Sequence, residues 1–282
     1  MRFEAIGTGW QIDTAESIAP AIQTAIHERI DVFDRTYSRF RDDSLVSRIA
    51  ETLGTFEFPD DAGPLFDTYR RLYAATKGAV SPLVGHAMDD LGYDRAYSLR
   101  PTGRAGPAPS WDDAFAWDGR VLTTARPVSV DVGAAGKGYL VDIISELLVD
   151  AGHTEFIVDG SGDIRHAGSQ GIRVALEHPK DPTKAIGVAN LRGNSICASA
   201  SNRRAWGNGL HHVIDATTGL PTRGVIATWA ISALAREADG IATALFFAEP
   251  SRIEAEFDFT WARMMSDGRV ECSPHLDGEI FT

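Results

Sequence analysis

At 282 residues the chain is long enough to bury a sizeable core, as one large domain or as two modest ones. Hydrophobic residues make up 44% and charged residues 23% of it, the balance of an ordinary globular protein. The net charge of −12 argues against a protein that binds the nucleic-acid backbone, because such binding needs a basic face that displaces counterions. If the substrate is an anionic nucleotide, an acidic protein of this kind is expected to need a divalent cation.

Cysteine content and the N-terminal segment bear on the compartment. Cys197 and Cys272 are too few for a disulfide framework and are interpreted as inert thiols in a reducing compartment. Residues 1–8 include an acidic residue, Glu4, and have no continuous apolar stretch of the kind found in secretory signals. No apolar run reaches the length of a membrane span. The sequence therefore predicts a cytoplasmic protein.

In the first half of the chain, helices are predicted more clearly than strands. A strand interrupted by glycines is expected over 3–12, and apolar residues at helical spacing predict a helix over 16–34. Asp43 and Ser44 are good N-caps for a shorter helix, and a third helix is expected over 64–76, ending at a lysine and a glycine. Residues 100–110 hold three prolines and two glycines and predict a loop.

The second half is richer in predicted strands. Strands are expected over 114–117, 121–123, 128–132, 156–158, 172–176, 185–190, 195–198, 212–214 and 227–233, and helices over 137–150 and 237–247. Strands outnumber strand–helix–strand units, so an α+β fold with mixed or antiparallel sheets flanked by helices is predicted rather than a doubly wound parallel sheet. A single domain over 1–282 is expected, with two intertwined subdomains around the loop near 100–110 as the alternative.

A glycine-rich turn over 131–139, between a predicted strand and a predicted helix, is the first candidate site. Glycines allow a close approach of the backbone to a ligand, and the N-terminus of the following helix offers free N–H groups to a phosphate. It is neither a Walker A loop nor a dinucleotide fingerprint, because Lys137 is followed by Gly138 rather than Ser or Thr and the other glycines are misplaced. A tight turn with a solvated lysine explains the same residues.

The second candidate is a pair of oxygen-bearing side chains, Asp239 and Thr243. They are four residues apart near the start of a predicted helix and therefore share one face. A carboxylate and a hydroxyl suit Mg²⁺, which proteins hold through few ligands besides substrate phosphate. Alternatively, Asp239 favours the helix N-terminus electrostatically and Thr243 bonds back to a backbone carbonyl.

The third candidate is a strand that ends in a turn over 211–221. His212 at such a position can act as an acid, a base or a ligand-positioning group. Asp215 and Gly219 also have ordinary roles in a turn. His211 and His212 are adjacent on a strand and point to opposite faces, so a joint metal site is not expected.

Taken in order along the chain, these segments resemble the ApbE-like family, the FAD:protein FMN transferases, from near the first residue to about Phe247. The resemblance rests on seven segments: Ile6-Gly7-Thr8, Ser38 to Ser44, Gly78 to Gly85, Asp131 to Asp142, Gly160-Ser161-Gly162-Asp163, His212 to Pro221 and Ala238 to Ala244. It implies an enzyme that cleaves the pyrophosphate of FAD, joins FMN through a phosphoester to a Thr or Ser hydroxyl of an acceptor flavoprotein, and releases AMP.

The resemblance also implies roles for individual residues. Asp239, Thr243 and the backbone carbonyl of Gly136 would hold Mg²⁺ against the pyrophosphate. His212 would transfer a proton and border the reaction centre with Asp215, while Lys137 and Asp142 would position the nucleotide and Phe40 would lie near a ring of FAD. The catalytic residues implied are His212, Asp239 and Lys137, and the residues implied to contact FAD are Phe40, Gly133, Lys137, Gly138, Asp142, Gly162, Asp163, Ser199, His212 and Asp215.

Several positions depart from the family pattern. Gly136 replaces an alanine, Ser81 an aspartate, Ala50 an asparagine and Ala200 a glycine. Most members of the family are exported lipoproteins, whereas neither a signal nor a lipobox cysteine is recognised here. Three other interpretations stay open: an FAD pyrophosphatase that releases FMN and AMP, a non-catalytic FAD-binding protein, and a partner-binding module that keeps only the fold.

Overall fold

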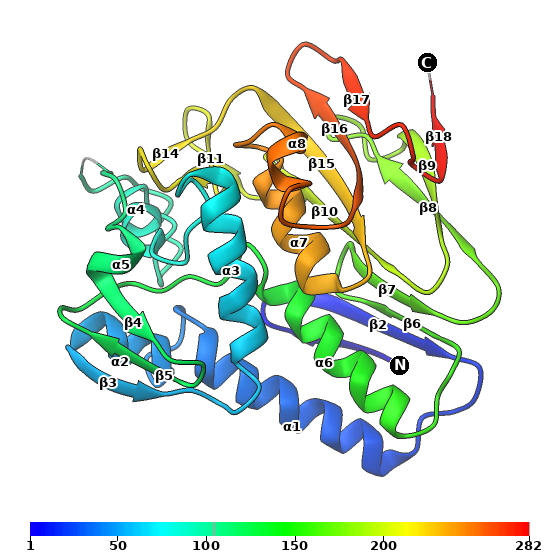
Figure 1. The fold of residues 1–282 in the computed structure, drawn as a ribbon, viewed down its shortest axis with the longest axis horizontal. Coiled ribbons are helices and arrows are strands. Elements are labelled where there is room, and N and C mark those ends of the chain that lie inside the picture. The colour runs from blue at the N-terminus through cyan, green and yellow to red at the C-terminus, as the bar shows by residue number, and fades with distance from the viewer. Residues whose placement is uncertain (104, 282) are drawn as a thin grey trace.

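A computed structural model describes residues 1–103 and 105–281 of the chain. Its centre is an eight-stranded sheet in which all neighbouring strands are antiparallel (Figure 1). In spatial order its strands are β1 (Arg2–Ala5), β2 (Thr8–Thr14), β6 (Phe156–Asp159), β7 (Asp163–Ala167), β10 (Ser195–Ala200), β15 (Val225–Ser232), β16 (Thr260–Met265) and β17 (Val270–Cys272). The predicted α+β class is confirmed.

Helices cover one face of this sheet (Figure 1). The helices are α1 (Pro20–Tyr37), α2 (Leu45–Glu51), α3 (Gly63–Thr76), α4 (Gly85–Asp90), α5 (Trp111–Ala114), α6 (Gly136–Asp150), α7 (Ala235–Ala244) and α8 (Pro250–Ile253). Helix α6 packs on α7 and β7, and α7 packs in turn on β10, β15 and α3. Ala230 of β15 joins the main apolar cluster on this side, together with Ile144 of α6 and Ile241 of α7. Within the described ranges, no helix combines the length and apolar character needed to cross a membrane.

The opposite face carries a three-stranded antiparallel sheet. In spatial order its strands are β18 (Gly278–Ile280), β9 (Ala185–Leu191) and β8 (Ile172–Glu177). Trp229 and Ile231 of β15 alternate with Ala230 and pack with Leu191 of β9 in a second apolar cluster. Because successive side chains of a strand point to opposite faces, β15 contributes to both cores and joins the three layers.

Three smaller sheets lie beside these layers. They are the sheet of β3 (Gly54–Glu57), β5 (Val121–Thr124) and β4 (Phe115–Trp117), the hairpin of β11 (Ala205–Trp206) and β12 (Leu210–His211), and the hairpin of β13 (Ile214–Asp215) and β14 (Leu220–Pro221). The two hairpins bring residues 204–206 and 212–214 to the cavity described below.

Most predicted helices are confirmed within a few residues. The helix expected over 64–76 is α3, and it ends at Lys77, whose φ of 54° is left-handed as expected of a C-terminal stop. Ser44 caps α2 by accepting a hydrogen bond from the backbone N–H of Ser47 at 3.1 Å. The helix expected over 16–34 is shifted: α1 begins at Pro20, because proline fits the first turn of a helix.

Two predicted strands are wrong. Residues 128–132 are extended but pair with no strand that the structure describes; the N–H of Val128 donates to Ile49 O and that of Asp131 to Pro82 O. The strand expected over 212–214 is broken, since β12 ends at His211 and β13 begins at Ile214. Conversely, β7, β16, β17 and β18 have no counterpart among the predicted elements. The loop expected over 100–110 contains no helix or strand at its described residues; Arg104 lies outside them.

Candidate active site

A cavity of about 800 Å³ lies beside the glycine-rich turn that precedes α6. Its volume is within the range of small-molecule sites. The predicted site residues that line it are Phe40, Gly133, Gly136, Lys137, Ser199, His212 and Thr243. These residues come from segments far apart in the sequence, so the fold converts scattered motifs into one site. Gly138, Asp142, Gly162, Asp163, Asp215 and Asp239 are not part of the cavity wall.

Asp239 is buried behind the cavity and contacts the start of α6. Its Oδ2 accepts a hydrogen bond from the backbone N–H of Gly138 at 2.9 Å. The two helices approach closely here, because a Cβ at Gly138 would lie 2.2 Å from the carbonyl oxygen of Ala235. Gly138 therefore serves the contact between α6 and α7 rather than lining the cavity.

A backbone carbonyl lies next to Thr243, and it belongs to Ala134. The first helical hydrogen bond of α6 runs from the N–H of Tyr139 to Ala135 O, so the N–H of Gly138 is one of those that the helix leaves unpaired. Asp239 accepts from this N–H, and Ala134 O accepts a hydrogen bond from Thr243 Oγ1 at 3.5 Å. The resemblance pointed to Gly136 as the source of this carbonyl, but Gly136 is the first residue of α6. The oxygens that face one another thus come from Ala134 and Thr243, with Asp239 one helical turn before Thr243.

Lys137 and two carboxylates form a charged cluster behind the cavity wall. The Nζ atom of Lys137 lies 3.0 Å from Oδ2 of Asp163. Asp163 is fully buried, with 0% exposure, and neither of its carboxylate oxygens has a well-aligned hydrogen-bond donor among the described residues. Burial raises the pKa of Asp239, and the nearby Asp163 carboxylate raises this pKa further. Asp163 therefore pairs with the ammonium group of Lys137, while burial favours the neutral form of Asp239.

The ammonium group of Lys137 is committed to the protein. Besides its ion pair with Asp163, it donates to Gly160 O at 2.8 Å and to Ser161 O at 3.4 Å. Two of its three donors are thus used in hydrogen bonds to the backbone, and Asp163 balances its charge. Lys137 thus anchors the turn between β6 and β7 to α6, and its predicted contact with the nucleotide would require breaking one of these interactions.

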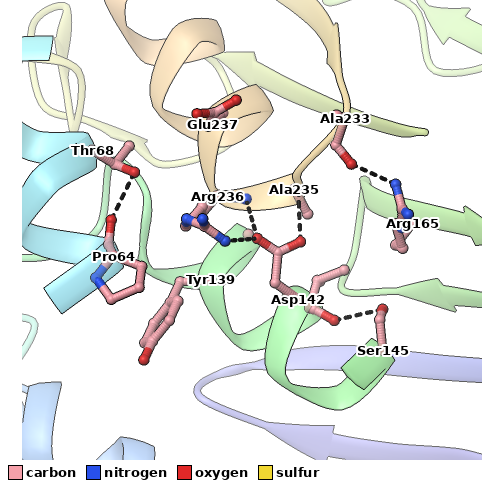
Figure 2. A network of polar contacts seen from close by, with 12 residues as sticks. Pro64, Thr68, Tyr139, Asp142, Ser145, Arg165, Ala233, Ala235, Arg236 and Glu237 are labelled. Atoms are coloured by element: carbon pink, nitrogen blue, oxygen red, sulfur yellow. Dashed lines mark hydrogen bonds and ion pairs between the residues drawn. The ribbon is translucent and has the colours of Figure 1, made fainter. Parts of the chain in front are cut away.

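Asp142 caps another helix and lies away from the cavity. Figure 2 shows its carboxylate in α6 pointing to the first turn of α7. Oδ1 accepts from the N–H of Ala235 at 2.8 Å, while Oδ2 accepts from the N–H and the guanidinium of Arg236, both at 3.1 Å. A carboxylate at this place satisfies N–H groups that the helix itself leaves unpaired. The geometry therefore gives Asp142 a structural role at the start of α7, and its contact with the nucleotide stays a prediction.

Asp215, and Gly162 in the turn between β6 and β7, form hydrogen bonds within their own turns. Asp215 Oδ1 accepts hydrogen bonds from the N–H of Thr217 at 2.8 Å and from its hydroxyl at 2.6 Å, an arrangement typical of a turn. The N–H of Gly162 donates to Asp159 Oδ1 at 2.9 Å. Neither Asp215 nor Gly162 lines the cavity, whereas Ser199 of β10 does.

His212 lies in the cavity wall as a neutral imidazole. Burial lowers its pKa to about 4, and the nearby charge of Arg204 contributes to the shift. Its Nδ1 is buried and has no hydrogen-bond partner among the described residues. The ring is therefore unprotonated at neutral pH and has a nitrogen that is free to accept a proton.

An aromatic cluster, which the sequence analysis did not identify beyond Phe40, forms another part of the wall. Phe40 and Tyr97 are stacked with ring centroids 4.8 Å apart, and Tyr93 and Trp206 are stacked at 5.6 Å. Planar rings of this kind favour a planar ligand. In the sequence, the only signal for these aromatic rings is the spacing of Tyr93 and Tyr97 in a loop flanked by glycines.

A buried arginine beside this cluster also escaped the sequence analysis. Arg39 bonds to Asp131 at 2.5 Å and to Asp89 at 2.9 Å, and its guanidinium lies 4.3 Å from the ring centroid of Phe40. Asp131 in turn accepts from the N–H of Gly133 at 2.7 Å. Because Arg39 and Asp131 are far apart in the sequence, no local pattern reveals the pair.

Comparison with protein families gives a match that spans most of the chain. The model described as the ApbE family matches residues 6–259. The chain belongs to the ApbE family. It is 25% identical over 275 residues to the FAD:protein FMN transferase of Klebsiella pneumoniae (strain 342), covering 89% of this chain and 79% of that relative. It is 26% identical over 244 residues to the FAD:protein FMN transferase of Rhodobacter capsulatus, of which it spans about half (46%; 80% of this chain).

Solved structures of the family have the same fold. The ApbE protein of Thermotoga maritima matches with a TM-score of 0.83 at 22% identity, covering 97% of this chain and 96% of that one. The flavin transferase ApbE of Vibrio cholerae matches with a TM-score of 0.80 at 22% identity and the same coverage. At these identities the likeness shows the fold.

Proposed function

We propose that the chain is a Mg²⁺-dependent FAD:protein FMN transferase. Family membership and the names of its curated relatives support the transferase activity. The observation that carries the proposal is that Thr243, Ala134 and His212 line one cavity with Phe40, while Asp239 lies one helical turn before Thr243 in α7. Oxygen ligands, a neutral imidazole and an aromatic surface are the groups that this reaction needs.

The oxygen atoms near Thr243 fit a magnesium ion. Asp239 supplies a carboxylate, Thr243 a hydroxyl and Ala134 a carbonyl, all hard ligands of the type that Mg²⁺ prefers. A bound cation would also stabilise the charged form of Asp239, whose pKa is raised by burial. The ion would neutralise charge on the pyrophosphate, so the acidic net charge of the protein is no obstacle. Among the described residues, no cluster of three or more His, Cys, Asp or Glu side chains offers a competing metal site.

In the proposed reaction, the hydroxyl oxygen of an acceptor Thr or Ser attacks the phosphorus of the FMN half. A phosphoester bond forms, the bridging P–O bond to the other phosphate breaks, and AMP leaves with the electron pair. The imidazole of His212 takes the hydroxyl proton, because the residue lines the cavity and burial keeps its ring neutral at neutral pH. Phosphoryl transfer depends mainly on positioning and charge, so no covalent nucleophile of the enzyme is needed.

The experiment that tests the proposal follows both products of FAD cleavage. Purified protein is incubated with FAD and Mg²⁺, with and without a cell extract, and AMP release is measured beside covalent flavin fluorescence on a denaturing gel. AMP together with a fluorescent acceptor band supports transfer. AMP with free FMN and no band would indicate the pyrophosphatase, and no AMP in either sample would indicate a binding protein.

We also infer a single domain and a cytoplasmic location. The main apolar cluster takes side chains from Trp10 to Trp261, which supports one folding unit rather than two subdomains. The location is supported by the two free cysteines, Cys197 and Cys272, which suit a reducing compartment. Fractionation of cells that express the tagged protein tests it, and recovery in a membrane or exported fraction would contradict it.

A further inference from the structure

Four cationic side chains line the cavity, and three of them are neutralised by carboxylates. The pairs are Arg39 with Asp131 and Asp89, Arg41 with Asp34 and Asp43, and Lys137 with Asp163. The fourth is Arg204, which is exposed and forms no ion pair with any residue of the ranges 1–103 and 105–281. In a protein with a net charge of −12, an arginine in a ligand cavity without a carboxylate partner is unusual and calls for an anionic ligand.

The hairpin of β11 and β12 places Arg204 beside His212. Ala205 pairs with His211 in this ladder, and the next step brings Arg204 opposite His212, whose N–H donates to Arg204 O at 3.3 Å. Residues directly opposite each other in an antiparallel pair project to the same side. Both line the cavity, so a positive charge stands next to the proposed proton acceptor.

We infer that Arg204 is the phosphate-binding residue of the cavity and holds the pyrophosphate of FAD next to His212. This inference rests on the proposed function. A guanidinium binds phosphate oxygens through two parallel N–H donors and is weakly hydrated, so it fits a pyrophosphate diester better than an ammonium does. Binding by Arg204 costs no existing ion pair, whereas Arg39, Arg41 and Lys137 would each have to give one up.

Arg204 also affects the proton acceptor. After burial, its positive charge is the main factor that lowers the pKa of His212, with a smaller lowering by His211 and opposing effects of a hydrogen bond to the Arg204 backbone and of Asp131. Removing the charge of Arg204 therefore raises the pKa of His212, and the acidic limb of the pH–rate profile moves to higher pH.

The test compares ligands with and without phosphate. Binding of FAD, inorganic pyrophosphate and riboflavin is measured by titration calorimetry in buffer with EDTA, using Arg204→Gln, Arg204→Lys and Arg203→Gln. Arg203 is the matched control, because it is the adjacent arginine, is paired with Glu177 at 2.8 Å and does not line the cavity. We expect Arg204→Gln to weaken FAD and pyrophosphate roughly 10- to 100-fold, as for a lost charged hydrogen bond, and to leave riboflavin unchanged. Arg204→Lys should retain part of the affinity, and Arg203→Gln all of it.

Two results would overturn the inference. One is an Arg204→Gln variant that binds FAD and pyrophosphate as tightly as the parent protein. The other is a variant that loses affinity for riboflavin as much as for FAD, since the arginine would then shape the cavity instead of binding phosphate. AMP release by the parent protein is measured separately. If it is absent while the affinity for FAD depends on Arg204, the inference holds and the proposed transferase activity fails.

Discussion

The backbone N–H of Gly138 donates to the carboxylate of Asp239 at 2.9 Å, and this one bond links the first turn of α6 to α7. The carbonyl of Ala134, which lies just before α6, faces Thr243 of α7. The contact between the two helices therefore holds the proposed metal ligands together. Gly138→Ala would place a Cβ 2.2 Å from Ala235 O and separate the helices.

For Gly138→Ala we expect a loss of about 1–3 kcal/mol in the free energy of unfolding, the usual cost of overpacking, together with a loss of FAD cleavage. Denaturant unfolding and AMP release measure the two effects. Gly106→Ala is the control, because a Cβ there has no atom within 4 Å. Unchanged stability of Gly138→Ala would show that the helices can separate without cost.

Asp239→Asn keeps a side-chain oxygen that can accept the Gly138 bond but removes the charge. We expect FAD cleavage to fall at least about 100-fold, because the stabilisation of phosphate charge by a metal amounts to several kcal/mol. The residual rate should not respond to added Mg²⁺, whereas the parent protein should lose activity in EDTA and regain it with Mg²⁺. A variant with full Mg²⁺-dependent activity would disprove the proposed metal site.

Asp142→Ala is expected to affect stability rather than substrate binding. It removes the cap of α7 and leaves Arg236 without its partner, so we expect the free energy of unfolding to fall by about 1–3 kcal/mol. Well below the melting temperature, the Kd for FAD should stay unchanged. Glu146→Ala, one turn further along α6 at an exposed position, should change neither quantity. A selective rise in Kd would restore the role implied by the family resemblance.

Lys137 and Asp163 are expected to be strongly coupled. Lys137→Met leaves the carboxylate of Asp163 buried without its cation and should cost about 3–5 kcal/mol. Adding Asp163→Asn removes the buried charge, so the double variant should recover most of the loss. A double-mutant cycle of unfolding free energies measures the coupling, and strictly additive effects would mean that the ion pair contributes nothing.

The pH dependence of transfer should follow His212. Its pKa of about 4 lies below the ordinary value of 6.5, so the ring is already neutral, and able to accept a proton, well below pH 6. The rate should therefore stay level from neutral pH down to about pH 5 and fall only near pH 4. His212→Gln should lower the rate about 100-fold or more across this range. An acidic limb centred near pH 6.5 would instead indicate a solvated histidine.

Local sequence patterns predicted those helices whose ends carry capping residues. Lys77 and Gly78 end α3, and Ser44 starts α2, because capping depends on residues within one turn. The strand expected over 128–132 failed for the opposite reason. A strand exists only with a partner strand, whereas the N–H of Val128 donates to a carbonyl of helix α2 and that of Asp131 to a carbonyl in a turn.

The roles of the predicted site residues stay predictions. Phe40, His212 and Thr243 line one cavity, as residues of a common site would. The function of Asp142 depends on Ala235, 93 residues further along the chain, and no spacing in the sequence shows that contact. The sequence does not show that Arg204 differs from the other cationic residues of the cavity, because that difference lies in their ion pairs.

The cavity wall takes residues from Ile6 to Phe247. It therefore forms only when nearly all of the chain has folded, and many of its contacts join distant segments, which slows folding. A ligand that binds this cavity binds the native state alone. At a concentration of 100 times its Kd, FAD would add about 2.7 kcal/mol to the stability of the whole protein. The supply of flavin would then influence how much folded protein a cell maintains.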